Sequence, residues 1–409
     1  MSPTRREFLK SAIGASAVVS LAPVLPSFLR QAACAADGGN GQRENVLVVV
    51  QLSGGNDGLN TVVPYEDDAY GRNRTTLRLD PRGLHKIDSL LGFHPEMQAV
   101  WKLYQEGLLS VVQGVGYPNN DRSHEIAMRD WHTAQPGNAT CQTGWVGRAI
   151  DLMGEQKAGS IPGAFVGPIA TPFALNARRS VVPSIRSLDQ LTLHQGRLQA
   201  GLISDEAGTD GLLDHLRLAA TSARDTSQRV EQVLDSSAEA GTEYPPFQLA
   251  GLLKQVAQLI RARIGIRIFF TELGGGGIGG FDNHAGQRDN HAALLRQFSE
   301  SVAAFARDLQ RDGHLERVVL MTVSEFGRTL AENGRRGTGH GDAAPLFLVG
   351  GGLQGGLIGP HPSLTELDNG APESHTDFRR VYATVLDQWL GLDSRGVLGE
   401  EYQPLSLFG

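Results

Sequence analysis

The chain has little of what several common classes of protein depend on. Its 409 residues include only 2 cysteines, Cys34 and Cys141, so at most one disulfide can form. There is no CxxC, no CxxCH and no Cys/His cluster with zinc-finger spacing, which argues against iron–sulfur, c-type haem and structural zinc sites. Basic residues are not in excess either. The net charge is -7, and we therefore expect no nucleic-acid partner.

Long uninterrupted apolar runs are also missing, and the start of the chain is typical of an export signal. Residues 4–10 (TRREFLK) resemble the twin-arginine motif at every position, and a small-residue apolar stretch that two prolines interrupt follows over 11–29. We expect residues 1–36 to be a twin-arginine signal peptide and the twin-arginine export machinery to be a partner. The mature chain is expected in the periplasm or outside the cell, with no stable membrane span after processing.

What the chain does contain is a series of shorter apolar runs that end in glycine. The first, VLVVVQLSGG from residue 46, has no polar alternation, which is typical of a strand buried on both faces. A helical pattern over 94–107 separates it from a second run, and this order favours parallel strands. Further strands are expected over residues 108–116, 262–275, 314–329 and 345–351.

These patterns predict one α/β domain over residues 44–409, with a central, mostly parallel sheet between two layers of helices. The polar, helical text over about 185–260 is interpreted as a helical insertion in this domain. The glycine-rich segment 350–355 is expected to be a hairpin turn between the two apolar segments that flank it.

Aspartate, glutamate, histidine and serine residues follow these predicted strands. Because the carboxyl ends of parallel strands share one edge of a sheet, we expect the side chains to gather there. Imidazole and carboxylate groups are ligands of divalent metals. The residues are Asp57, Ser123, Asp282, His284, Glu325 and His340.

Ser123 stands at a predicted helix start, where two interpretations are open. The serine is a helix cap and nothing more, or it is a nucleophile whose anionic substrate is held by the free N–H groups of the helix. Arg122 or Arg328 is expected to steady an oxyanion through a bidentate contact.

Five segments taken together resemble a known family. SGGNDGLNTVVPY, QGVGYPNNDRSH, FDNHAGQ, SEFGRT and GTGHG, behind a twin-arginine signal, are similar to an exported bacterial family of unknown function related to the alkaline phosphatase and sulfatase superfamily. The resemblance runs from about Val46 to the C-terminus. It implies an alkaline-phosphatase-like three-layer fold and a nucleophile at Ser123. No Cys-x-Pro-x-Arg run is present, so a formylglycine sulfatase is not expected.

The resemblance also implies metal ligands in two groups. The group for which Zn or Mn is expected consists of Asp282, His284 and His340. A second group, Asp57 with Glu325, lacks a histidine because Phe326 stands where the superfamily has one. A site made mainly of oxygen ligands suits Mg or Ca.

The function that follows from these expectations is metal-dependent hydrolysis or transfer on a small anionic substrate, a phosphate or sulfate ester. The alternative is a non-catalytic periplasmic binding protein on the same scaffold with a degenerate metal site, since a fold does not fix a function.

Overall fold

The computed structural model describes residues 44–156, 162–180, 182–186, 188, 242–274 and 280–409. The predicted signal peptide and most of the predicted helical insertion lie outside these residues. None of the helices within them is long and apolar enough to cross a membrane.

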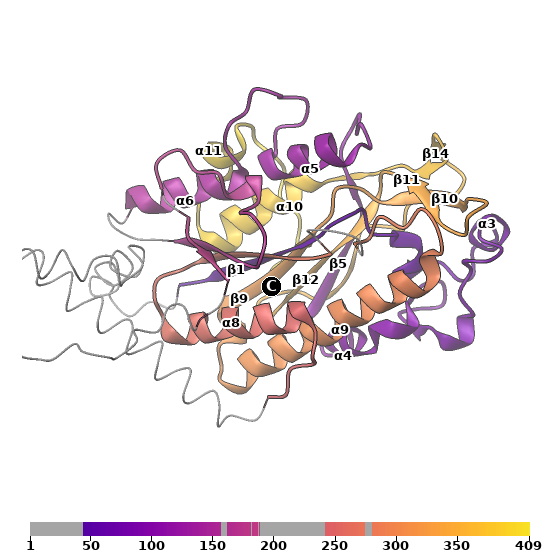
Figure 1. Cartoon of the computed structure of the whole chain (residues 1–409), viewed down its shortest axis with the longest axis horizontal. Helices are drawn as coiled ribbons and strands as arrows, with labels where there is room; N and C mark the ends of the chain where they lie inside the picture. Colours follow the sequence, from indigo (N-terminus) through magenta and orange to yellow (C-terminus); the bar gives the residue numbers. More distant parts are fainter. Residues whose placement is uncertain (1–43, 157–161, 181, 187, 189–241, 275–279) are drawn as a thin grey trace, which may run out of the picture.

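A central sheet of nine strands within the described part of the chain organises the fold (Figure 1). The strands follow the order β13-β5-β12-β9-β1-β8-β6-β7, and β16 also pairs with β5. Their bounds are β1 (Val46–Leu52), β5 (Leu109–Gly116), β6 (Gly163–Val166), β7 (Ser184–Ile185), β8 (Ile268–Leu273), β9 (Val318–Val323), β12 (Ala344–Gly350), β13 (Gly356–Ile358) and β16 (Thr376–Asp377).

The prediction of a mostly parallel sheet is confirmed. Strand β1 pairs in parallel with β8 on one side and with β9 on the other. The exception is β12, which is antiparallel to both of its neighbours, β5 and β9. The predicted hairpin between β12 and β13 is wrong, because β5 lies between these two strands and pairs with both.

Two layers of helices cover the sheet, as Figure 1 shows, with α4, α8 and α9 on one face and α5, α6, α10 and α11 on the other. The helices are α3 (Asp68–Asn73), α4 (Gln98–Gln105), α5 (His124–Thr133), α6 (Trp145–Gln156), α8 (Gln248–Ala262), α9 (Gln287–Arg311), α10 (Phe378–Thr384) and α11 (Ser394–Leu398). Short helical turns span Gly58–Asn60, Pro81–Gly83, Pro95–Met97, Phe173–Leu175, Leu315–Arg317 and Val385–Leu390.

The apolar run of β1 explains its central place. Val48 and Val50 belong to the core formed with α4, α8 and α9, whereas Leu47 and Val49 belong to the core on the opposite face. A strand whose successive side chains are all buried needs apolar residues at every position, which is what the sequence provides. The three-layer architecture predicted from the sequence is therefore confirmed.

Among the described residues, three small sheets lie outside the central one. The strands β10 and β11 form an antiparallel pair in which Arg328 stands opposite His340. The strands β14 and β15 form a short hairpin, and β2, β3 and β4 form a three-stranded sheet. Their bounds are β2 (Val62–Val63), β3 (His85–Lys86), β4 (Gly92–Phe93), β10 (Arg328–Glu332), β11 (Thr338–His340), β14 (Leu367–Asp368) and β15 (Ala371–Pro372).

Candidate metal centre

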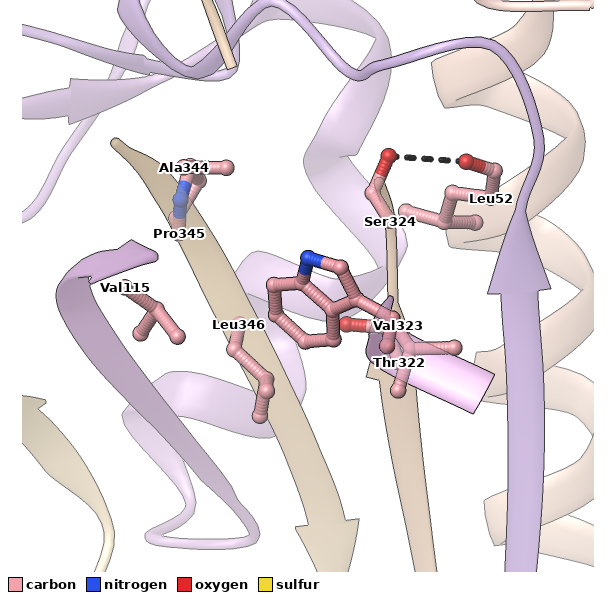
Figure 2. Close-up of a pocket in the computed structure, with 9 residues that line it drawn as sticks. Leu52, Val115, Thr322, Val323, Ser324, Ala344, Pro345 and Leu346 are labelled. Carbon is pink, nitrogen blue, oxygen red and sulfur yellow. Dashed lines mark hydrogen bonds between the residues drawn. The ribbon is translucent and has the colours of Figure 1, made fainter. Parts of the chain in front are cut away.

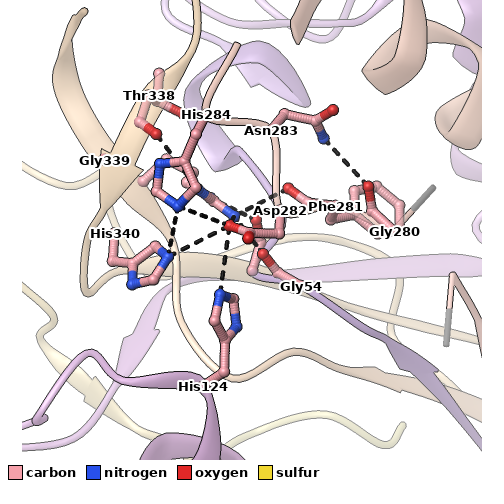
Figure 3. Close-up of polar contacts among 12 residues, drawn as sticks. Gly54, His124, Gly280, Phe281, Asp282, Asn283, His284, Thr338, Gly339 and His340 are labelled. Carbon is pink, nitrogen blue, oxygen red and sulfur yellow. Dashed lines mark hydrogen bonds and ion pairs between the residues drawn. The ribbon is translucent and has the colours of Figure 1, made fainter. Parts of the chain in front are cut away.

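Four potential metal ligands meet beyond the carboxyl ends of the parallel strands. His124 is the first residue of α5, Asp282 and His284 lie between β8 and α9, and His340 ends β11. One ligand atom from each residue lies within 4.8 Å of every other. Figure 3 shows the three imidazole rings arranged around the Asp282 carboxylate.

The three rings direct the same nitrogen towards the same oxygen. The Nε2 atom of His284 lies 2.9 Å from Asp282 Oδ1, and those of His124 and His340 each lie 3.3 Å from it. The Nε2 atoms of His284 and His340 are 2.8 Å apart. So close an approach of ring nitrogens and a carboxylate oxygen is the arrangement expected of ligands that share one cation.

Hydrogen bonds at the other ring nitrogens indicate which tautomer two of the histidines adopt. The Nδ1 atom of His124 lies 3.0 Å from Glu325 Oε1, and that of His340 lies 2.7 Å from the main-chain carbonyl of Arg122. A carboxylate and a carbonyl can only accept, so we assign the hydrogen to Nδ1 in both rings. In the neutral rings, the Nε2 lone pairs then face a carboxylate oxygen, and a cation between them satisfies both partners. The residues present therefore fit a metal ion.

Solvent reaches this cluster. The exposed fraction of the four side chains runs from 24% for His340 to 42% for Asp282. A bound ion would keep an open face, which is the property that separates catalytic from purely structural metal sites. Buried Phe326 packs behind the rings, with its centroid 4.6 Å from that of His340 and 5.0 Å from that of His124.

A buried arginine fixes the carboxylate. The side chain of Arg328 is fully buried, and its Nη2 lies 2.7 Å from Asp282 Oδ1. Burial by itself would raise the pKa of Asp282, but the hydrogen bond and charge of Arg328 hold that pKa below its ordinary value. The carboxylate is thus kept ionised, and its charge is balanced by a group that belongs to the protein.

The Gly54–Gly55 corner makes this arrangement possible. Both residues have positive φ, +111° and +78°. A Cβ on Gly54 would lie 2.4 Å from the Asp282 nitrogen, and one on Gly55 would lie 2.4 Å from the Phe326 ring. The corner carbonyls accept hydrogen bonds from Arg328. The glycines after β1 therefore bring the main chain against the cluster, where no side chain would fit.

The comparison with sequence families bears on the identity of the chain. A family described as "Protein of unknown function (DUF1501)" matches residues 94–403. The chain belongs to the DUF1501 family. The comparison with curated proteins found no match.

Solved structures similar to this DUF1501 chain have low sequence identity to it. The C-terminal periplasmic domain of EcEptC from Escherichia coli, in complex with Zn, is 11% identical over 76% of this chain and 73% of its own, with a TM-score of 0.35. A protein in the alkaline phosphatase superfamily from Vibrio parahaemolyticus is 11% identical over 91% and 77%, with a TM-score of 0.36. The lipoteichoic acid synthase LtaP from Listeria monocytogenes is 10% identical over 90% and 74%, with a TM-score of 0.37. Similarity at this level transfers no activity.

Asp57 requires a correction to its predicted role as a metal ligand. The structure gives both of its carboxylate oxygens to Arg74, at 2.5 and 2.9 Å, and Gln287 donates a further hydrogen bond. Asp57 and Arg74 are both buried. Burial would raise the pKa of Asp57, but the charge and hydrogen bonds of Arg74 hold it below its ordinary value. Asp57 is thus part of a buried ion pair and does not join the cluster in this DUF1501 fold.

Glu325 was predicted to be a metal ligand, but in the structure it contacts the cluster through His124. Its Oε1 accepts hydrogen bonds from the Gly54 nitrogen at 2.7 Å and from His124 Nδ1, so it contacts a member of the cluster and does not belong to the cluster itself. Because Arg74 takes both carboxylate oxygens of Asp57, Asp57 is not available as a ligand of the predicted Mg or Ca site, although Glu325 Oε2 is buried without a hydrogen-bond partner. The three residues of the other predicted group, Asp282, His284 and His340, lie close together, and His124 joins them.

The three residues expected to act on the substrate also have structural partners. Ser123 caps α5, and its Oγ accepts from the Ile126 nitrogen at 3.4 Å. The guanidinium of Arg122 forms an ion pair with Asp368, 2.5 Å away. Arg328 is buried against main-chain carbonyls and Asp282. The two arginines are therefore not placed to steady an oxyanion, which corrects that prediction, whereas Ser123 remains beside the cluster as the neighbour of His124.

His124 belongs to the cluster but was not among the residues predicted from the sequence. The signal was available, because His124 follows Ser123 in the loop that the second apolar run feeds. A histidine was expected beside Glu325, where the sequence has Phe326. In the structure, the first turn of α5 supplies that imidazole instead, and Phe326 packs against it.

A small pocket lies close to the strand ends but apart from the cluster (Figure 2). Its walls come from β1, β5, β9, β12 and Trp131 of α5, and Ser324 closes one side by donating to the carbonyl of Leu52 at 2.8 Å. None of the four clustered residues lines it. The open face of the cluster, and not this pocket, is the candidate site for a substrate.

Zinc affinity is expected to fall as the pH is lowered, and the fall should begin at a higher pH than for a site made of ordinary histidines. The hydrogen bond to Glu325 raises the pKa of His124, so protons compete for this ligand at higher pH than for an ordinary histidine. Below that pKa, affinity should drop about tenfold per pH unit for each proton displaced. The measurement is zinc affinity as a function of pH. Glu325→Gln should shift the fall to lower pH, and a profile that does not move would contradict the role of Glu325.

Proposed function

We propose that this protein is an exported, metal-dependent hydrolase or transferase that acts on a phosphate or sulfate ester. The observation that carries the proposal is the convergence of three imidazole Nε2 atoms on Asp282 Oδ1, on a face open to solvent. Zn or Mn is the ion that best suits three nitrogens and one oxygen. We infer one ion per chain, because Asp57 is neutralised by Arg74.

The electrostatics of the cluster favour an anionic substrate. Arg328 balances the charge of Asp282, and neutral histidines add none. A bound divalent ion would therefore leave the site with net positive charge, and it would supply a Lewis acid that polarises an ester oxygen. The protein holds the rings of His124 and His340 in place through Glu325, the Arg122 carbonyl and Phe326, so these two residues need little rearrangement to bind an ion.

Ser123 is the proposed nucleophile. Its Oγ accepts a hydrogen bond from the first turn of α5, so its own hydrogen is free to be donated. The free N–H groups of that turn and the positive end of the helix lie at the same place and favour an anion. Attack of Oγ on the ester phosphorus or sulfur would form the Ser123 ester and release the alcohol, and water or a second alcohol would then accept the group.

Ser123→Asn is expected to reduce turnover about 10³-fold or more while leaving zinc content unchanged. Asparagine caps a helix as well as serine does, so this variant removes the nucleophile and keeps the cap. Ser123→Thr is the matched control, because it keeps a hydroxyl. The assay is turnover of phosphate and sulfate mono- and diesters by metal-loaded protein, with zinc measured per chain. Equal turnover by wild type and Ser123→Asn would assign the attack to water.

The second candidate function is metal-dependent binding without catalysis. It is favoured by one observation: Arg122 and Arg328, the two arginines expected from the sequence to steady an oxyanion, are both engaged by protein partners. Metal-loaded protein that binds phosphate or sulfate esters but turns none over would support this function. Protein that binds no metal would contradict both functions.

A further inference from the structure

We propose that Arg122 is a positioning residue that acts through its main-chain carbonyl. The carbonyl, aimed by a left-handed backbone conformation, fixes the Nδ1–H tautomer of His340 and so keeps the Nε2 lone pair of that ring directed at the metal. This inference rests on the proposed metal site. It differs from the sequence-based expectation, in which the guanidinium of Arg122 was the functional group.

The contact itself is short and specific. The Nδ1 of His340 lies 2.7 Å from the Arg122 carbonyl oxygen, and a carbonyl can only accept. A ring that donates from Nδ1 has its lone pair on Nε2, the atom that faces Asp282 and His284. Partners of this kind set the orientation and basicity of metal-binding histidines. Loss of the contact would let the other tautomer, which cannot bind the ion through Nε2, compete.

The backbone at Arg122 is in a conformation that few side chains adopt. Its φ is +62°, in the left-handed region, where glycine is at ease and a residue with a Cβ is disfavoured. The Arg122 nitrogen donates to Asn120 Oδ1 at 3.0 Å, and the hydroxyl of Tyr117 donates to the same oxygen at 3.2 Å. Uncommon conformations that the surroundings maintain in this way are concentrated at functional sites.

The side chain of Arg122 also stabilises this backbone conformation, through its contacts with Asp368. Its guanidinium donates to the Asp368 carbonyl at 3.2 Å and pairs with the Asp368 carboxylate at 2.5 Å. Asp368 belongs to the β14–β15 hairpin, whose Gly370 carbonyl accepts from Leu330 in β10. The carbonyl and the guanidinium therefore have different partners, and substitution can separate their contributions.

The test compares two substitutions that remove the same guanidinium. Arg122→Ala and Arg122→Gly both lose the Asp368 contact, but only glycine adopts positive φ without cost. If the carbonyl is the functional group, Arg122→Ala should bind zinc about 10- to 100-fold more weakly than wild type, and Arg122→Gly within about threefold. Asp368→Asn, which weakens the ion pair from the hairpin side, should also stay within about threefold. The measurement is competition with a chromophoric chelator.

A second readout needs no metal. In the metal-free protein, the imidazole ¹⁵N shifts of His340, assigned by their loss in His340→Gln, should report the Nδ1–H tautomer in wild type and Arg122→Gly and a mixture in Arg122→Ala. Equal zinc affinities and tautomers in the alanine and glycine variants would overturn the inference, whether both fall or neither changes. Failure of wild type to bind zinc would overturn the proposed function, while the ¹⁵N shifts would still decide the role of the carbonyl.

Discussion

Asp57→Asn is expected to destabilise the protein by about 3–5 kcal/mol without changing the zinc content of the folded chain. The substitution leaves the guanidinium of Arg74, fully buried, without its counter-charge, and the loss of one partner of a buried pair has a cost of this size. Arg74 also donates to Asn60 and to the carbonyls of Thr329 and Leu330, so it cannot turn to solvent without breaking these bonds. The measurement is the free energy of unfolding in urea, with zinc determined at each stage.

The matched control is Asp80→Asn, which breaks an exposed pair with Arg82 and should leave stability unchanged. The pH dependence provides a further check. Because the pKa of Asp57 is lowered in the folded protein, its stabilisation is complete above the usual aspartate pKa and is lost only as the pH falls through the lower, folded value. A variant with normal stability that has lost its zinc would instead restore Asp57 to the ligand role predicted from the sequence.

His124→Ala is expected to lower zinc affinity by more than about 100-fold. Loss of a residue that only hydrogen-bonds to a metal ligand typically lowers affinity by about 10- to 100-fold. The larger effect is expected because His124 contributes one of the three nitrogens that face Asp282 Oδ1, at 3.3 Å. Glu325→Gln should have a smaller effect, about tenfold, because Glu325 acts on the metal only through His124. The measurement is zinc affinity by chelator competition for both variants.

His314→Ala is the control, since His314 is a partly buried histidine outside the cluster and its loss should leave zinc affinity unchanged. His284→Ala, in contrast, should abolish tight binding as His124→Ala does. If zinc affinity survives the loss of His124 but not of His284, the site has the three ligands implied by the sequence resemblance, and the fourth residue is only a neighbour.

The layered fold was predictable because a strand buried on both faces needs an uninterrupted apolar run, which can be seen in the sequence. Every residue of β1 had to be apolar or paired, since the two faces of that strand pack against different helices. The sequence of β12 does not indicate whether the strand runs parallel or antiparallel to its neighbours. An antiparallel and a parallel strand in the middle of a sheet are equally apolar, so the sequence favoured a hairpin with β13, and the structure has β5 between them.

The candidate site was predictable in its place and partly in its membership. Because the carboxyl ends of parallel strands share one edge of the sheet, the sequence predicted that Asp282, His284 and His340 lie together, and they do. The same reasoning failed for Asp57, since nothing in the local sequence shows that Arg74, directly after α3 and 17 residues away, folds back onto it. Pairing between side chains on different loops is a property of tertiary structure, and residue spacing carries little information about it.

The sequence separation of the ligands has a consequence for how the protein would acquire its ion. His124, Asp282 and His340 stand on segments that are 158 and 58 residues apart and meet only when the sheet has formed. An unfolded chain therefore offers an ion no preformed site, and nearly all of the binding free energy would appear as stability of the folded state. At a free zinc concentration of 100 times the dissociation constant, this amounts to about 2.7 kcal/mol. The lifetime of the protein in its compartment would then follow the local supply of metal, and scarcity of the ion would be felt as unfolding as well as lost activity.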